Sequence, residues 1–377
     1  MNFVDLNLFS QTNHTPSYGQ LYAQMETNHI PLKDYCIPVN PYFPPPAMLE
    51  EIKDGFMTAL KYYPAQNTSI VESLAEALDL NPKNLIVTNG STELLTLIDQ
   101  HFIQDRVAIP IPTFGQWTER PQKNNKDVFT YKRSEKNNFH LDLNQFSGFL
   151  LDHDIPVAVI CNPNNPTGAI NQKEELIGFI KNNAHLSLIV IDESFIDFSQ
   201  ENPPSLEDVA PNFHNVLVLK SLGKNYGLHG IRAGYGVCNE DLATKIKHFL
   251  PEWNINGVTE LVISLIKKYS TEYEISKVNV RKDRDYLYQS LKNSFFLQPF
   301  PSFGNFVYVK IPPFINGEQL RNDLLTQFGL LTRQCSNKIG SSAQYFRIAV
   351  RPKEQVDILI NALEILIRKS ARHHFVC

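Results

Sequence analysis

Five short apolar runs in the middle of the chain constrain its fold more than any other feature. They cover residues 85–88, 107–110, 157–160, 186–191 and 216–219. Each run has the length of a buried strand, and segments with helical spacing lie between them. Strands that alternate with helices in this way predict an α/β fold, with a mainly parallel sheet and helices on both faces.

The last third of the chain follows a different pattern. A long helical stretch, residues 258–291, precedes an apolar run at 307–311, a helix at 318–328 and a closing amphipathic helix at 352–369. This order predicts a smaller C-terminal α+β domain. We therefore expect a loosely packed arm over residues 1–34, a large domain over 35–255 and a small domain over 256–377, which includes part of the N-terminal segment.

Composition excludes several classes of function. The chain has 377 residues, enough for two domains, and its net charge of -4 gives no reason to expect a nucleic acid or a membrane as partner. No apolar run approaches the roughly 18 residues of a membrane span. The five cysteines are widely spaced, which argues against a disulfide framework or a metal site and for a reducing compartment. Because no signal-peptide pattern is visible, we expect a cytoplasmic protein.

A lysine follows the apolar run at 216–219. The sequence continues Ser221-Leu-Gly223-Lys224, and a lysine flanked by small residues at the end of a buried strand can lie inside a cleft. Loss of hydration lowers the pKa of such an amine, and a neutral amine can form a Schiff base. A lone lysine after a strand is more often a solvated loop residue, so this interpretation depends on the other motifs.

Polar motifs also follow the other apolar runs. Residues 89–93 read Asn-Gly-Ser-Thr-Glu and begin a helix, where free backbone N–H groups can bind an anion; simple capping by Ser91 is the alternative. Residues 161–168 read Cys-Asn-Pro-Asn-Asn-Pro-Thr-Gly, and Asp192 ends the run at 186–191. A carboxylate there is costly unless it is paired. Open α/β sheets bind their ligands at this edge, where the parallel strands end.

Together these motifs resemble those of the fold-type I pyridoxal-phosphate enzymes, the class I/II aminotransferases. The resemblance rests on the spacing of Ser221, Lys224 and Arg232, and on the Asn-Pro-Asn-Asn-Pro-Thr-Gly segment at 162–168. It spans roughly residues 40–350, and it is greatest to the histidinol-phosphate aminotransferase and threonine-phosphate decarboxylase branch. It implies pyridoxal 5'-phosphate as cofactor and a homodimer.

The resemblance assigns roles around the cofactor ring. It implies that Lys224 binds the cofactor covalently and acts as general acid and base, and that Asp192 pairs with the pyridine nitrogen. Asn165 would bind the phenolic oxygen, and Phe114 would stack on the ring. Trp117 is a second candidate for the pocket wall, although either aromatic residue could be plain core.

It also implies a phosphate site and a substrate site. The cofactor phosphate would be bound by Gly90, Ser91, Thr92, Ser221 and Arg232, and by Tyr63 of the other subunit unless Tyr63 is an ordinary surface residue. The substrate α-carboxylate would bind Arg347, with Asn40 at the mouth and Arg351 nearby. The alternatives are a structural ion pair for Arg347 and a surface position for Arg351.

Two activities fit this set of residues. The first is amino transfer between an amino acid and a 2-oxo acid. The second is decarboxylation of O-phosphothreonine or a similar phosphorylated amino acid, which Phe195, Cys335-Ser-Asn337 and Arg351 favour by their resemblance to that branch. A cofactor-binding protein without turnover is a third class of function. The intact set of Asn165, Asp192, Lys224, Arg232 and Arg347 argues against it.

Overall fold

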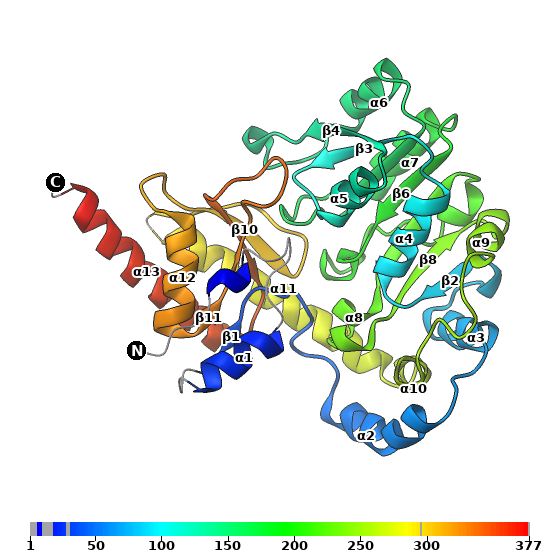
Figure 1. The fold of residues 1–377 in the computed structure, drawn as a ribbon, viewed down its shortest axis with the longest axis horizontal. Coiled ribbons are helices and arrows are strands. Elements are labelled where there is room, and N and C mark those ends of the chain that lie inside the picture. Colours follow the sequence, from blue (N-terminus) through cyan, green and yellow to red (C-terminus); the bar gives the residue numbers. More distant parts are fainter. Residues whose placement is uncertain (1–5, 10–17, 28–30, 295, 376–377) are drawn as a thin grey trace.

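The computed structural model describes residues 6–9, 18–27, 31–294 and 296–375. A seven-stranded sheet lies at the centre of its larger domain (Figure 1). The strand order is β2-β8-β7-β6-β5-β3-β4. The strands are β2 (Leu85–Thr88), β3 (Arg106–Ile111), β4 (Asp127–Lys132), β5 (Val157–Cys161), β6 (Leu188–Asp192), β7 (Val216–Ser221) and β8 (Gly234–Cys238). Only β8 runs antiparallel to its neighbours, so the predicted mainly parallel sheet is confirmed.

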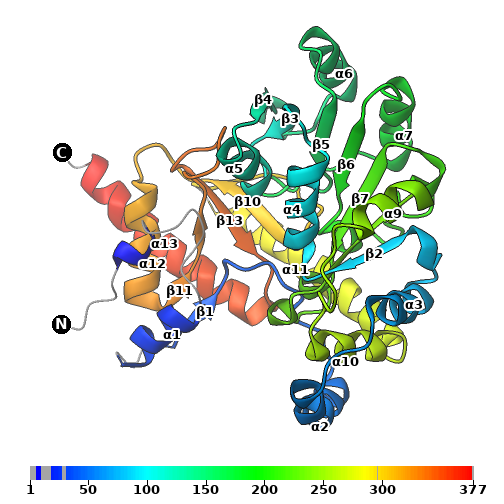
Figure 2. The ribbon, with the colours of Figure 1, turned by 45° about the vertical axis from the view of Figure 1, so that its right-hand side comes forward.

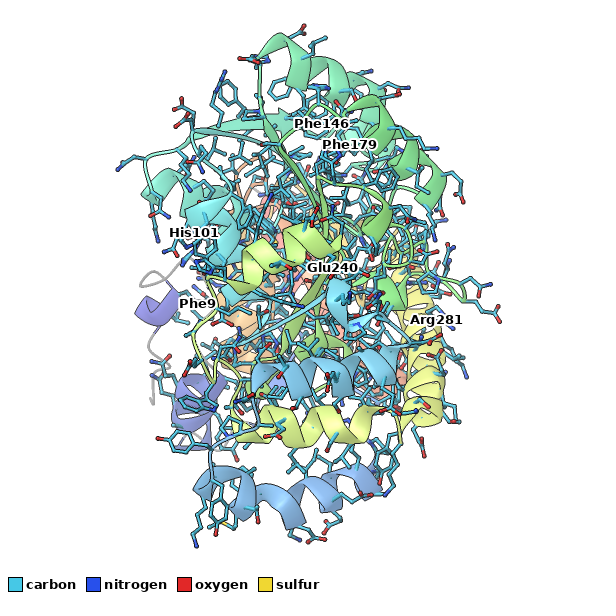
Figure 3. All side chains as sticks on the ribbon, turned by 90° about the vertical axis from the view of Figure 1, so that its right-hand side faces the viewer. Phe9, His101, Phe146, Phe179, Glu240 and Arg281 are labelled. Atoms are coloured by element: carbon cyan, nitrogen blue, oxygen red, sulfur yellow. The ribbon has the colours of Figure 1, made fainter. Side chains whose placement is uncertain are left out.

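Helices cover both faces of this sheet, as predicted. One face packs against α4 (Ser91–His101), α5 (Gln116–Lys123) and α9 (Glu240–Lys247). The other face packs against α6 (Leu143–Asp152) and α7 (Lys173–Asn182), which meet through the stacked rings of Phe146 and Phe179 with centroids 5.8 Å apart (Figure 3). Because both faces are covered, the central strands are apolar on both sides, which explains their uninterrupted hydrophobic runs.

The helical stretch predicted at 258–291 is divided into two helices. The first, α10 (Gly257–Ile266), packs against α2 (Pro46–Lys61) and α3 (Asn67–Leu78) beside the large sheet. The second, α11 (Ser270–Asn293), leaves this layer and reaches the core of the smaller sheet. The chain therefore crosses between the two sheets along α11, and a domain boundary at residue 255 stays a prediction.

The smaller sheet has four antiparallel strands in the order β12-β13-β10-β9. Their bounds are β9 (Gln298–Pro299), β10 (Phe306–Lys310), β12 (Arg333–Gln334) and β13 (Tyr345–Ala349). This sheet shares one apolar core with α11, α12 (Gly317–Phe328) and α13 (Lys353–Phe375). Figure 2 shows α12 and α13 on the side of the molecule away from the large sheet.

The described part of the N-terminal arm is packed, which corrects the prediction of a loose leader. Helix α1 (Tyr18–Thr27) buries Leu21 and Met25, four residues apart on one helical face, against Leu325 and Leu331. Strand β1 (Lys33–Asp34) then pairs in parallel with β11 (Leu330–Leu331). No described helix is long and apolar enough to cross a membrane.

Candidate active site

A cavity of about 430 Å³ brings together residues that follow the strands of the large sheet and residues of the small sheet. Seven of the predicted site residues line it: Ser91, Thr92, Phe114, Asn165, Lys224, Arg232 and Arg347. They come from segments that are far apart in the sequence. The structure thus places these motifs together at the carboxyl edge of the parallel strands, where open α/β sheets bind ligands.

Lys224 lies in helix α8 (Leu222–Asn225), directly after β7, and its amine faces aromatic rings. Its Nζ is 4.4 Å from the ring centroid of Phe195 and 5.7 Å from that of Phe114. Loss of hydration lowers the pKa of the amine to about 8, against the attraction of Asp192, and the positive charge of Arg347 also lowers it. More of this amine is therefore neutral near pH 7 than in an ordinary lysine, as nucleophilic chemistry requires.

The start of α4 forms a cradle for an anion. Gly90 precedes the helix with φ of 76°, and a Cβ at this position would stand 2.6 Å from Nη2 of Arg232. The same Nη2 donates to the hydroxyl of Thr92 over 3.4 Å, and Ser91 also faces the cavity. Glycine is thus favoured both by conformation and by space. The free N–H groups, the hydroxyls and the guanidinium make a donor set suited to a phosphate.

Asp192 is held at the end of β6 by three close donors, and the thiol of Cys161 is a weak fourth at 3.8 Å. Its Oδ1 accepts from the backbone N–H and the hydroxyl of Ser194, at 3.1 and 2.6 Å. Its Oδ2 accepts from the indole Nε1 of Trp117 over 2.9 Å. Trp117 is fully buried and does not line the cavity, which corrects its interpretation as a pocket wall. It orients the carboxylate instead, a role for which the sequence carries no signature.

Arg347 fixes the orientation of the Asn165 amide. Nη1 of the arginine donates to Oδ1 of Asn165 over 2.7 Å, and Nη2 donates to the backbone oxygen of Cys36 over 2.7 Å. Because Oδ1 is already engaged, the Nδ2 donor is the end of the Asn165 amide that remains for a ligand. Nε of Arg347 is buried without a partner among the described residues, so the guanidinium keeps a donor for an anion.

Three further basic residues line the cavity, and none of them has a role predicted from the sequence. Arg333 and Lys338 belong to the small domain, and His229 lies near Arg232. Burial lowers the pKa of His229 to about 4, and the charges of Lys224 and Arg232 act in the same direction. Arg333 stands in the segment that resembles the decarboxylase branch, so a signal for it existed. Lys338 carried none.

Two predicted substrate residues lie outside the cavity wall. The amide of Asn40 donates to the backbone oxygen of Asn225 and to Oγ of Ser276, at 3.0 and 2.8 Å. Arg351 is buried and donates to the backbone oxygen of Ile37 over 2.9 Å. These bonds engage both side chains in holding the segment that forms the wall. Their assignment as substrate contacts stays a prediction.

Two predicted phosphate contacts also lie away from the cavity. Tyr63 is 84% exposed, and its ring centroid lies 5.3 Å from that of Trp253. Ser221 is buried at the end of β7 and is not part of the cavity wall. Their contacts with a cofactor phosphate stay predictions.

Comparisons with known proteins agree with this geometry. Residues 34–363 match the family model described as aminotransferase class I and II. The chain belongs to this family. It is 28% identical over 365 residues to the L-serine phosphate decarboxylase of Campylobacter jejuni, which covers 93% of this chain and 92% of the relative.

Solved structures of the family have the same fold. A decarboxylase from Sulfurospirillum multivorans superposes with a TM-score of 0.85 at 29% identity, covering 94% of this chain and 93% of the other. The histidinol-phosphate aminotransferase of Clostridium acetobutylicum superposes with a TM-score of 0.81 at 27% identity, covering 90% and 100%. Another structural neighbour, the histidinol-phosphate aminotransferase of Sinorhizobium meliloti, is a complex with pyridoxal-5'-phosphate.

The residues in and behind the cavity wall fit this cofactor, although Gly90 and Asp192 do not themselves line the cavity. The cradle around Gly90 suits its phosphate, the oriented carboxylate of Asp192 suits its ring nitrogen, and Lys224 supplies the amine. Pyridoxal phosphate is therefore the cofactor of this enzyme. In the part of the chain that the structure describes, no group of three His, Cys, Asp or Glu side chains could hold a metal ion.

Proposed function

We propose that this enzyme decarboxylates a phosphorylated amino acid, with O-phospho-L-serine as the first candidate. The reaction breaks the bond between the α-carbon and the carboxylate, releases carbon dioxide and adds a proton to the α-carbon, which gives O-phosphoethanolamine. Two relatives with decarboxylase names, from Campylobacter jejuni and Sulfurospirillum multivorans, support this activity over general amino transfer.

The pairing of two arginines carries the proposal. Arg333 of β12 and Arg347 of β13 are direct partners across the antiparallel ladder, and both line the cavity. Like charges that face each other across a sheet destabilise it. The pair therefore suits a substrate with two anionic groups, an α-carboxylate for Arg347 and a side-chain phosphate for Arg333.

The residues of this chain divide the remaining work. Pyridoxal phosphate, once bound, supplies an electron sink for the charge left at the substrate α-carbon. Lys224 is the candidate to deliver a proton to that carbon, because its amine lies in the cavity and burial lowers its pKa to about 8. The rings of Phe114 and Phe195, which flank the amine, keep water away from it.

Amino transfer from a phosphorylated amine is the second candidate. The similarity to the histidinol-phosphate aminotransferase of Clostridium acetobutylicum favours it, and the same lysine could move a proton from the α-carbon. Both candidates use the same anion sites. They differ in whether carbon dioxide leaves and in whether the cofactor keeps the amino group.

The deciding experiment mixes the cofactor-loaded enzyme with O-phospho-L-serine or O-phospho-L-threonine, with no oxo acid present. Carbon dioxide and cofactor absorbance are followed together. We expect many equivalents of carbon dioxide per enzyme from at least one substrate. Conversion of the cofactor to its pyridoxamine form without carbon dioxide would reject decarboxylation and favour amino transfer. L-serine serves as the control that lacks the phosphate.

The proposed assembly is a homodimer, supported by an apolar patch on and after α2. The patch consists of exposed side chains that a second copy could cover: Phe56, Met57, Leu60, Tyr62 and Tyr63. The opposite side of α2 packs on α10, and Figure 1 shows α2 at the outer edge of the molecule. We keep the cytoplasm as the proposed compartment, because none of the four described cysteines is in a disulfide.

A further inference from the structure

Lys338 is a buried lysine in the cavity wall that none of the assigned roles uses. It lies in the connection between β12 and β13 and is only 8% exposed. Turn hydrogen bonds fix its backbone, because its N–H donates to the oxygen of Cys335 over 3.1 Å and its oxygen accepts from Ser341 over 2.9 Å. The loop therefore holds this ammonium group at one place in the wall.

The surroundings of Lys338 leave its charge available to a ligand. Among the described residues no carboxylate lies within 4.0 Å of its Nζ, which is 5.9 Å from the ring centroid of Phe114. The carboxylate of Glu119 lies beyond that distance. Its Oε1 and the Nζ of Lys338 are 2.5 and 2.7 Å from the point where a Cβ on Gly115 would stand. A buried ammonium without a close ion pair is costly, and an anion in the cavity would remove that cost.

We propose that Lys338, together with Arg333, binds the side-chain phosphate of the substrate and makes the site prefer a dianionic group over a monoanionic one. This inference rests on the proposed function for the choice of substrate. Arg347 takes the α-carboxylate and leaves Arg333 as one positive charge for the side chain. Lys338 adds the second charge, which a phosphate dianion matches and a carboxylate or sulfonate does not.

The pKa of the Lys338 ammonium agrees with this role. Burial lowers it to about 8, and Arg333 and Arg347 also lower it, whereas Glu119 and Cys335 act in the opposite direction. A bound dianion would raise this pKa. A phosphate monoester is mostly dianionic above about pH 6. The preference for a dianion should therefore be greatest between about pH 6 and 8 and decline above pH 8 as Lys338 loses its proton.

The test compares two ligands of the same length that differ by one charge, O-phospho-L-serine and L-homocysteate. Dissociation constants of both are measured on the cofactor-loaded enzyme by rapid mixing, from the change in cofactor absorbance. The enzymes are the wild type, Lys338→Gln, Lys338→Arg, Glu119→Gln and the surface control Lys292→Gln. Carbon dioxide release is measured in a separate assay. If the enzyme binds phosphoserine selectively but releases no carbon dioxide, the proposed function is rejected and this inference is supported.

We expect Lys338→Gln to weaken phosphoserine binding by roughly 10- to 100-fold, the effect of one lost charge-assisted hydrogen bond, and homocysteate binding by far less. Lys338→Arg should keep most of the preference, and Lys292→Gln should change nothing. Equal weakening of both ligands, or none, would overturn the inference. If Lys338→Gln does not fold, Glu119→Gln decides: removal of the competing carboxylate should tighten phosphoserine binding, and an unchanged constant would count against Lys338.

Discussion

The indole of Trp117 and the carboxylate of Asp192 are joined by a hydrogen bond of 2.9 Å beneath the candidate cofactor site. The bond connects helix α5 with the end of strand β6, and it is fully buried on the tryptophan side. An aspartate at the end of a central strand needs such partners, because an unsatisfied buried carboxylate is costly. Trp117 thus couples the core of the large domain to the chemistry of the cavity.

The first prediction concerns this bond. Trp117→Phe keeps an aromatic ring, although a smaller one, and leaves Oδ2 of Asp192 with only the weak thiol donor of Cys161, at 3.8 Å. We expect the free energy of unfolding of the cofactor-free protein to fall by about 2 kcal/mol, together with a lower turnover rate. Urea unfolding and carbon dioxide release measure the two effects. Ser194→Ala removes a donor from the other carboxylate oxygen and should also lower the stability and the turnover rate. If Trp117→Phe unfolds at the same urea concentration as the wild type, this account is contradicted.

The second prediction concerns the anion cradle. Gly90→Ala places a methyl group 2.6 Å from Nη2 of Arg232 and forces a residue with a side chain to adopt φ of 76°. We expect cofactor affinity to fall at least about tenfold, because Arg232 must move away from the phosphate site. Equilibrium dialysis against pyridoxal phosphate measures this. Gly148→Ala, where a Cβ meets nothing within 4 Å, is the matched control.

The third prediction concerns the pH dependence of stability. The pKa of Lys224 is lowered to about 8 in the folded protein, whereas an unfolded lysine titrates near 10.5. Between these values the unfolded chain binds more protons, so the contribution of this lysine to stability rises with pH. Lys224→Gln removes the charge. It should therefore stabilise the cofactor-free protein most below pH 8, and the difference should vanish as the pH approaches 10.5.

Urea unfolding of the cofactor-free wild type and Lys224→Gln between pH 7 and 10 measures this difference. Lys292→Gln, at an exposed position of α11, should show no such trend. The same Lys224→Gln protein should lose turnover by roughly 10²–10⁴-fold, the usual contribution of a positioned acid or base. A constant stability difference over this pH range would mean that the amine is not titrating in the cavity.

The fourth prediction concerns the paired arginines. Arg333→Gln removes one of two like charges that face each other across β12 and β13. We expect the ligand-free protein to become more stable by about 0.5 kcal/mol, while the KM for O-phospho-L-serine rises. Inorganic phosphate should raise the melting temperature of the wild type more than that of the variant. If phosphate stabilises both proteins equally, Arg333 is not the phosphate ligand.

The fifth prediction concerns the proposed dimer. Met57 is 71% exposed on α2, and Met57→Asp places a charge in the centre of the apolar patch. We expect the variant to sediment as a monomer and to lose activity, because Tyr63 could then no longer reach a second subunit. Ile365→Asp on α13, also at an exposed apolar position, is the control and should stay dimeric. A monomeric wild type would refute both the dimer and the role of Tyr63.

Much of the large domain could be predicted from the sequence, because its determinants are local. Buried parallel strands need continuous apolar runs, and the polar residues that follow them must lie at the carboxyl edge of the sheet. Lys224 and Asn165 were identified in this way, and both line the cavity. Strand β4 was not predicted, because it is only half-buried and has no continuous apolar run. The break between α10 and α11 was not predicted either, because helical spacing continues through both helices.

The sequence alone therefore determined five of the seven strands of the large sheet and the residues at its carboxyl edge. Only the tertiary structure decided which distant side chains meet there. The packing of two sheets brings Lys338 to Gly115, pairs Arg333 with Arg347, and joins Arg351 to the backbone oxygen of Ile37. Such contacts depend on strand register and on how the small domain packs against the large one, and neither leaves a periodic signal in the residues concerned.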